Sequence, residues 1–186
     1  MNSEEIQRFA KALKEGKTLL YPTDTVWGIG CDATNSEAVS QVCSIKQREE
    51  SKSLIILVDS FEMLAKYVKF IPEKAKEELK LATRPTTIIY QNPINLANNC
   101  VASDNTIAIR IVQNDFCNSL IKAFGKPIVS TSANSSGDPT PKSFSEISTT
   151  ILDSVDYIVN LQQEIIATAS SRILKISDDK VEVIRE

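Results

Sequence analysis

Three groups of residues in this chain have types and spacings that suit the binding of an anionic substrate. The first is Lys46 with Arg48, placed at the predicted end of a helix and in the loop before an apolar strand. A lysine supplies a compact charge and an arginine a planar fork, and both match phosphate oxygens. Loops at strand and helix ends are also where α/β sheets place ligands. The alternative interpretation is that these cations only interact with the negative end of the helix dipole.

The second group is the polar run Ser130–Gly137, which follows the apolar strand residues Ile128 and Val129. Its hydroxyls and its amide, Asn134, can orient a triphosphate or a carboxylate through several hydrogen bonds. A Ser/Asn-rich turn without a ligand is the alternative.

The third is Arg110, within the apolar strand sequence TIAIRIV. A charged side chain in such a strand needs a partner or faces a cleft, so a salt bridge and a binding site are both open interpretations. Tyr21 and Trp27 are interpreted as core aromatics.

Composition excludes several kinds of chemistry. The 186 residues include no histidine, so no Ser-His-Asp triad, histidine metal ligand or imidazole base exists in the sequence. The net charge is −3, from 21 Lys+Arg and 24 Asp+Glu, which does not indicate a strongly basic nucleic-acid surface. The four cysteines form no Cys-x-x-Cys pair, which favours reduced, buried thiols over a zinc site.

The glycines and the apolar runs exclude further classes. No glycine-rich phosphate loop is present, and Gly28-Ile29-Gly30 lacks the third glycine of a dinucleotide fingerprint. We interpret these two glycines as allowing close strand packing. The N-terminus has no signal-peptide pattern, and no apolar run approaches the ~20 residues of a membrane span. The expected localisation is cytoplasmic.

Helical and strand patterns interleave along the chain, which predicts an α/β fold with a twisted mixed sheet and flanking helices. A first helix begins at Asn2 or Ser3 and ends at Gly16, and a later one ends at Gly125. The other predicted helices cover about 36–46 (capped by Ser36), 60–68, 72–82, 114–124 and 143–152. The predicted strands are TLLYP, VWGIG, LIILV, TTIIY, TIAIRIV, PIVST, DYIVN, SRILKI and KVEVIRE.

Four ordered motifs resemble one known family. Tyr21–Ile29, YPTDTVWGI, resembles the YPT[DE]TVYGL signature of the YrdC/TsaC family, the threonylcarbamoyl-AMP synthases. Lys46-x-Arg48, the sequence AIRI that contains Arg110, and Ser132-x-Asn134 follow at the family's spacing. The resemblance extends from about Gly16 to the end of the chain. It implies one YrdC-like domain over residues 1–186, in a short form without the second domain of longer relatives.

The resemblance also implies a reaction. Members of the family are nucleotidyltransferases that use L-threonine, bicarbonate and ATP to make threonylcarbamoyl-AMP and pyrophosphate. The threonylcarbamoyl group later goes to an adenosine of tRNA, so downstream tRNA threonylcarbamoyl-transfer proteins are the implied partners. We expect Mg²⁺ on the phosphates, although no carboxylate cluster in the sequence marks a protein-held metal site.

By resemblance, the site residues fall into three groups. Catalytic roles at the phosphates and the carbamate are implied for Lys46, Arg48, Ser132 and Asn134. Further ATP contacts are implied for Thr106 and Arg185, and threonine contacts for Thr23, Arg110, Ser130 and Ser171, with Ser170 as the alternative to Ser171.

Other functions stay open at this point. One is a paralogue of the YciO type that shares the fold but uses different substrates. Another is a double-stranded RNA-binding module with weak RNA binding and no synthase activity, which the net charge of −3 does not favour. A carbamoyl-transfer domain of the hydrogenase-maturation type is disfavoured, since its accessory domains are not found in the sequence.

Overall fold

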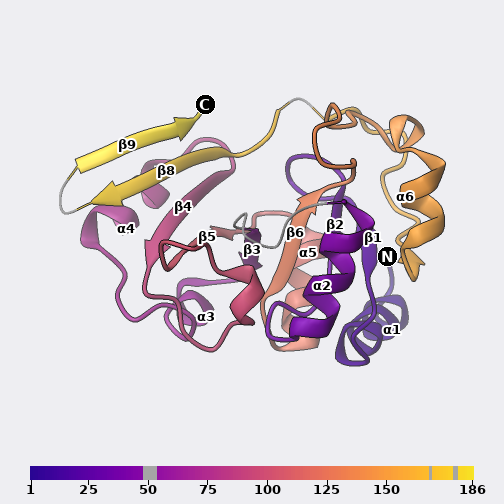
Figure 1. Ribbon diagram of the computed structural model, residues 1–186, viewed down its shortest axis with the longest axis horizontal. Helices are drawn as coiled ribbons and strands as arrows, with labels where there is room; N and C mark the ends of the chain where they lie inside the picture. Colours follow the sequence, from indigo (N-terminus) through magenta and orange to yellow (C-terminus); the bar gives the residue numbers. More distant parts are fainter. Residues whose placement is uncertain (48–53, 168, 178–179) are drawn as a thin grey trace.

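Helices and strands alternate along the chain in the computed structural model, which describes residues 1–47, 54–167, 169–177 and 180–186 (Figure 1). The predicted site residue Arg48 lies outside the described residues. The helices are α1 (Ser3–Lys14), α2 (Ser36–Ile45), α3 (Phe61–Leu64), α4 (Glu73–Leu81), α5 (Asp115–Phe124) and α6 (Thr149–Ser154), with 3-10 turns η1 (Asn98–Cys100) and η2 (Phe144–Glu146). The strands are β1 (Leu19–Tyr21), β2 (Gly28–Gly30), β3 (Ile55–Val58), β4 (Thr86–Gln91), β5 (Thr106–Ile111), β6 (Ile128–Ser132), β7 (Tyr157–Ile158), β8 (Arg172–Ser177) and β9 (Lys180–Arg185).

Within the described residues, nine strands form one sheet in the order β7-β1-β2-β6-β3-β5-β4-β8-β9. The pairs β1–β7, β3–β5 and β4–β8 are parallel and the others antiparallel, so the predicted mixed sheet is confirmed. In Figure 1, helices α1, α2, α5 and α6 gather around the β1–β2–β6 end of the sheet, and α4 lies near the β4–β8 end. Helix α3 packs against the central strands β3 and β5. In this strand order, most neighbouring strands are not consecutive in the sequence.

The helix ends follow local capping chemistry. Asn2, one of the two predicted caps, caps α1 in a capping box with Glu5. Gly125 ends α5 in the left-handed conformation at φ 82°, as predicted. The predicted cap of α2 was wrong by one residue, because the side chain of Asn35, not that of Ser36, accepts hydrogen bonds from the backbone N–H groups of Glu37 and Ala38.

Two predicted helices are shorter than their sequence patterns. The helix predicted over 60–68 is only α3, since the chain turns after Leu64 and the Tyr67 carbonyl accepts a hydrogen bond from the Ile94 N–H group at 2.9 Å. The helix predicted over 143–152 is divided into η2 and α6, because Ser148 starts a new helix by capping the Ile151 N–H group. In both places a tertiary or capping contact overrides apolar periodicity.

The core explains the second glycine of β2, Gly30. A Cβ on Gly30 would lie 2.1 Å from the carbonyl oxygen of Val129 and 2.8 Å from the ring of Tyr21, so only glycine allows this approach of β2 to β6. Tyr21 is fully buried and donates its hydroxyl to the Val129 carbonyl at 2.9 Å. Trp27 is also buried, which confirms the interpretation of both aromatics as core residues.

All four cysteines are buried, reduced thiols. Burial raises the pKa of Cys100 to about 12 and also raises the pKa of Cys31 and Cys117. We expect a disulfide reagent at pH 8 to label the native chain slowly and to react with four thiols per chain in guanidinium chloride.

The same pKa shifts set a dependence of stability on pH. Because the folded state keeps protons that unfolded thiols release near pH ~8.5, this contribution to stability is complete below that pH and declines above it. The measurement is urea unfolding between pH 7 and 10, beside the labelling rate. Rapid labelling of one thiol in the native chain at pH 8 would contradict the burial of that thiol.

No helix in the described part of the chain has the length and apolarity needed to cross a bilayer.

Candidate functional site

A cavity of about 310 Å³ lies over the central strands of the sheet. Its size falls at the lower end of the range for small-molecule sites. Its apolar wall includes Leu54, Ile55, Ile89, Ile173 and Ile184. Its polar lining includes Thr25, Thr106, Arg110, Ser130, Ser132, Thr140, Ser170, Ser171 and Arg185. The cavity therefore combines an apolar wall with hydroxyls and two guanidinium groups.

Strand register explains why these side chains meet. Ile55 of β3 pairs with Ser130 of β6 on one side and with Ala108 of β5 on the other, so these residues form one row across the sheet. Since side chains alternate along a strand, Ser132 and Arg110 lie on the same face as this row. Because β6 runs antiparallel and β5 parallel to β3, Ser132 lies on one side of the row and Arg110 on the other. The hydroxyls of β6 and the arginine of β5 thus share the face of the sheet that lines the cavity.

Arg110 lines the cavity and is only 3% exposed. One terminal nitrogen, Nη2, donates to Oδ1 of Asp24 at 2.9 Å and lies 3.4 Å from the hydroxyl of Thr25. The salt bridge expected for a buried arginine is therefore present, and the same side chain also lines the cavity. The salt bridge is confirmed, and the binding role of Arg110 stays a prediction.

Arg185 reaches the cavity from β9. Its Nε donates to the carbonyl oxygen of Ser171 at 2.9 Å, and its Nη2 donates to the Ser171 hydroxyl at 3.1 Å. Ser171 is fixed in turn by the hydroxyl of Thr87, which donates to it at 2.9 Å. Burial first, and then the positive charge of Arg110, lower the pKa of Arg185. Two cations in one partly buried cavity repel each other and favour an anionic ligand between them.

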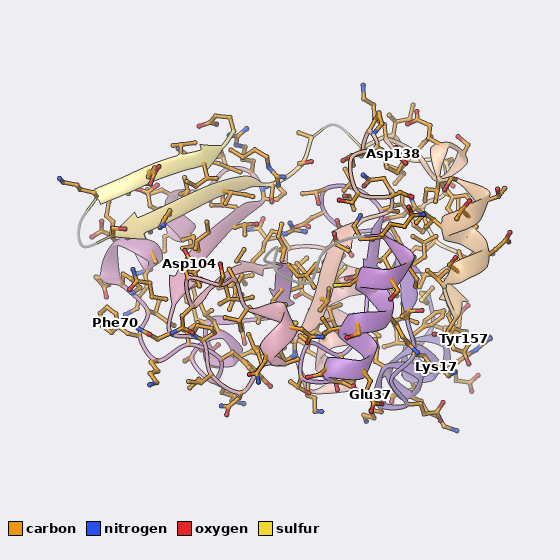
Figure 2. The ribbon with its side chains drawn as sticks, in the orientation of Figure 1. Lys17, Glu37, Phe70, Asp104, Asp138 and Tyr157 are labelled. Atoms are coloured by element: carbon orange, nitrogen blue, oxygen red, sulfur yellow. The ribbon has the colours of Figure 1, made fainter. Side chains whose placement is uncertain are left out.

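Lys46 connects the end of α2 to the turn after β6. Its Nζ donates to the carbonyl oxygens of Ser132 and Asn134, at 2.5 Å each, and its own carbonyl accepts from the Ser136 N–H group at 2.7 Å. The Asn134 amide donates to the carbonyl oxygens of Ser135 and Asp138 at 3.0 and 2.8 Å. This loop lies beyond the carboxyl end of β6, where Figure 2 labels Asp138. Lys46 and Asn134 thus hold the turn that presents Ser132.

Two threonines of the predicted site make local hydrogen bonds. The Thr23 hydroxyl donates to the Val26 carbonyl at 2.8 Å and accepts from the Thr25 N–H group at 3.0 Å, which fixes the turn before β2. The Thr106 hydroxyl donates to Oδ1 of Asp104 at 2.6 Å at the start of β5, and Asp104 is labelled in Figure 2.

The cavity gathers most of the residues that the sequence singled out. Its described lining includes Thr106, Arg110, Ser130, Ser132, Ser171 and Arg185. Thr23, Lys46 and Asn134 belong to the turns beside it, and Arg48 is outside the described residues. Sequence reasoning missed the roles of Asp24, Thr25 and Thr140. The signal for Asp24 was present, since a buried arginine requires an acceptor and Asp24 is the acid in the polar turn between two apolar strands.

The donor set of the cavity suits an anion better than a bare metal ion. Magnesium prefers several carboxylate or carbonyl oxygens, whereas the lining supplies hydroxyl and guanidinium groups. Among the described residues, no group of three or more acidic or cysteine side chains is placed to hold a metal ion. A magnesium ion would fit here as part of a metal–nucleotide substrate, held through the phosphates.

Comparisons with known proteins agree with the geometry. The family model Sua5_yciO_yrdC, described as "Telomere recombination", matches residues 11–186. Threonylcarbamoyl-AMP synthase of Pseudoalteromonas translucida is 36% identical over 152 residues, which cover 80% of this chain and 81% of that protein.

Two solved structures share the fold. P. abyssi Sua5 complexed with L-threonine is 25% identical with a TM-score of 0.88, and the match covers all of this chain and 54% of Sua5. The chain thus spans about half the length of Sua5. E. coli YciO is 22% identical with a TM-score of 0.86 and is matched over 90% of its length, which shows the common fold.

Proposed function

The chain belongs to the Sua5/YciO/YrdC family, and we propose that it is an L-threonylcarbamoyladenylate synthase that uses L-threonine, bicarbonate and ATP. The observation that supports this most is the cavity that Arg110 and Arg185 line together with the hydroxyls of Ser130 and Ser132. A substrate with a carboxylate and a polyphosphate has a matching distribution of charge.

The reaction suits a site without histidine. The amine of threonine attacks the carbon of bicarbonate, and loss of water leaves a carbamate. A carbamate oxygen then attacks the α-phosphorus of ATP, the bond to the bridging oxygen of the β-phosphate breaks, and pyrophosphate leaves. The demands on the protein are alignment of three anions and stabilisation of charge at phosphorus, which fixed cations and hydrogen-bond donors supply.

Each polar group then has a proposed role. The Arg110 guanidinium binds the threonine carboxylate, and the Arg185 guanidinium faces the nucleotide phosphates, where it offsets their charge. Lys46 fixes the turn that carries Ser132 and adds positive potential beside it. The remaining proposed threonine contacts are Thr23, Ser130 and Ser171, and the remaining proposed contacts to ATP and the carbamate are Arg48, Thr106, Ser132 and Asn134.

Several further properties belong to the same proposal. Residues 1–186 act as one YrdC-like domain, and Mg²⁺ enters on the ATP phosphates, where it offsets their charge. The product passes to downstream proteins that transfer the threonylcarbamoyl group to tRNA in the cytoplasm.

Pyrophosphate release from ATP tests the proposal. We expect release only when L-threonine and bicarbonate are both present, and a coupled phosphate assay in bicarbonate-depleted buffer measures it. Threonylcarbamoyl-AMP identified by mass spectrometry is the matching product. ATP binding without threonine-dependent release would reject the synthase and favour a paralogue of the YciO type, whose fold this chain shares over 90% of YciO.

A further inference from the structure

We propose that Asp24 is a positioning residue that holds the guanidinium of Arg110 for the carboxylate of a bound amino acid. Asp24 is outside the groups assigned above to substrate contact. The identity of the ligand as L-threonine rests on the proposed function, whereas the geometry of Asp24 and Arg110 does not.

Both oxygens of the Asp24 carboxylate accept hydrogen bonds from fixed donors. Oδ1 accepts from Nη2 of Arg110 at 2.9 Å, and Oδ2 accepts from the backbone N–H of Gln113 at 3.3 Å. Gln113 follows β5, so Asp24 ties the turn before β2 to the end of the strand that carries Arg110. The Asp24 side chain is 10% exposed and that of Arg110 is 4% exposed, so water has little access to compete for the hydrogen bond between them. The carboxylate therefore holds one end of the guanidinium in place.

One donor of Arg110 is unused in the described part of the structure. Its Nε is buried and has no hydrogen-bond acceptor among the described residues. A buried donor without an acceptor is unfavourable, and an oxygen of a ligand carboxylate would satisfy it. Since Asp24 occupies Nη2, it leaves Nε for the ligand. The guanidinium thus has one nitrogen bound to the protein and another whose acceptor we assign to the bound carboxylate.

The two arginines of the cavity differ in their surroundings. Arg110 is paired with the charge of Asp24, whereas Arg185 contacts only the neutral oxygens of Ser171 among the described residues. The paired arginine selects a carboxylate through hydrogen-bond geometry, because most of its charge is already balanced. The other arginine retains more charge for a polyphosphate. Loss of Asp24 is therefore expected to weaken the binding of an amino acid and to leave ATP binding nearly unchanged.

The variant Asp24→Asn tests this role. Arg110 Nη2 and the Gln113 N–H group are both donors, and an amide side chain can offer its single oxygen to only one of them. We expect the KM for L-threonine to rise about tenfold, the size of one charge-assisted hydrogen bond. The kcat and the KM for ATP should stay within about twofold of the wild type. Asp24→Ser is the second variant, because a single hydroxyl also cannot accept from both donors at once. We expect the same rise in the KM for L-threonine.

Calorimetric titration of L-threonine and L-threoninol gives a readout that does not depend on turnover. L-Threoninol lacks the carboxylate, so wild-type protein should prefer L-threonine and Asp24→Asn should lose about tenfold of that preference. Asp32→Asn is the matched control, since Asp32 is a buried carboxylate that accepts from Thr34 and Lys126 and does not line the described part of the cavity. This control should lower stability and leave the preference intact.

The outcomes separate the two proposals. Unchanged affinity and preference in Asp24→Asn and Asp24→Ser would overturn the positioning role, even if the enzyme is a synthase. Threonine binding that depends on Asp24, without pyrophosphate release, would support the positioning role and reject the proposed function. Absence of L-threonine binding by the wild-type chain would overturn both.

Discussion

Replacing Arg110 with lysine is expected to lower kcat/KM for L-threonine by at least about 100-fold, while the chain stays folded. A lysine ammonium can still pair with Asp24, so no buried carboxylate is left without a cation. It cannot donate from two separate nitrogens in one plane, as a guanidinium does to a carboxylate. The loss should appear mainly in the KM for threonine and in calorimetric affinity.

Arg172→Lys is the control for that experiment. Arg172 is also an arginine of a sheet strand, but it is 30% exposed and pairs with Glu186 at 3.4 Å, not with the described residues around the cavity. We expect kinetics within about twofold of the wild type, since exposed ion pairs contribute little. Threonine kinetics that survive Arg110→Lys unchanged would show that the carboxylate binds elsewhere.

Replacing Lys46 with methionine is expected to lower the free energy of unfolding by about 3 to 5 kcal/mol. Lys46 is only 2% exposed, and its ammonium holds the carbonyl oxygens of Ser132 and Asn134. Methionine fills a similar volume but leaves both oxygens without that donor. The melting temperature should fall by about 10 °C, and activity should fall with it because the turn that presents Ser132 loses its support.

Lys17→Met is the matched control for Lys46. Lys17 also forms an ion pair, with Asp156 at 3.3 Å, but its side chain is 47% exposed. We expect a loss below about 1 kcal/mol, because water can replace the partner. Urea unfolding of the two variants beside the wild type measures the difference. Equal stability of Lys46→Met and the wild type would show that the buried ammonium does not support the turn.

Much of the fold followed from the sequence because its local signals agree. The apolar run TIAIRIV predicted a strand, and the structure has β5 there, over Thr106–Ile111. Glycine at position 125 marked a helix end that the structure confirms, and Asn2, one of the two predicted caps, starts the first helix. These features depend only on neighbouring residues, so a single sequence contains them.

The arrangement of the cavity required information that local patterns lack. The partner of Arg110 is Asp24, which is 86 positions away, and Arg185 meets the charge of Arg110 from a different strand. The order and register of the strands decide these contacts, and neither is encoded in the periodicity of one segment. The alternative of a salt bridge or a binding site at Arg110 could not be resolved from sequence for the same reason, since both depend on which strands become neighbours.

The span of the cavity along the chain has a consequence for folding. Its lining begins at Thr25 and ends at Arg185, and it draws on strands whose sheet neighbours are far apart in sequence. Contacts between residues so far apart in sequence form slowly. The lining is complete only when the last strand, β9, has paired with the sheet. A ligand in this cavity therefore distinguishes the fully assembled sheet from every partly folded chain, and by mass action it stabilises the whole molecule as one cooperative unit.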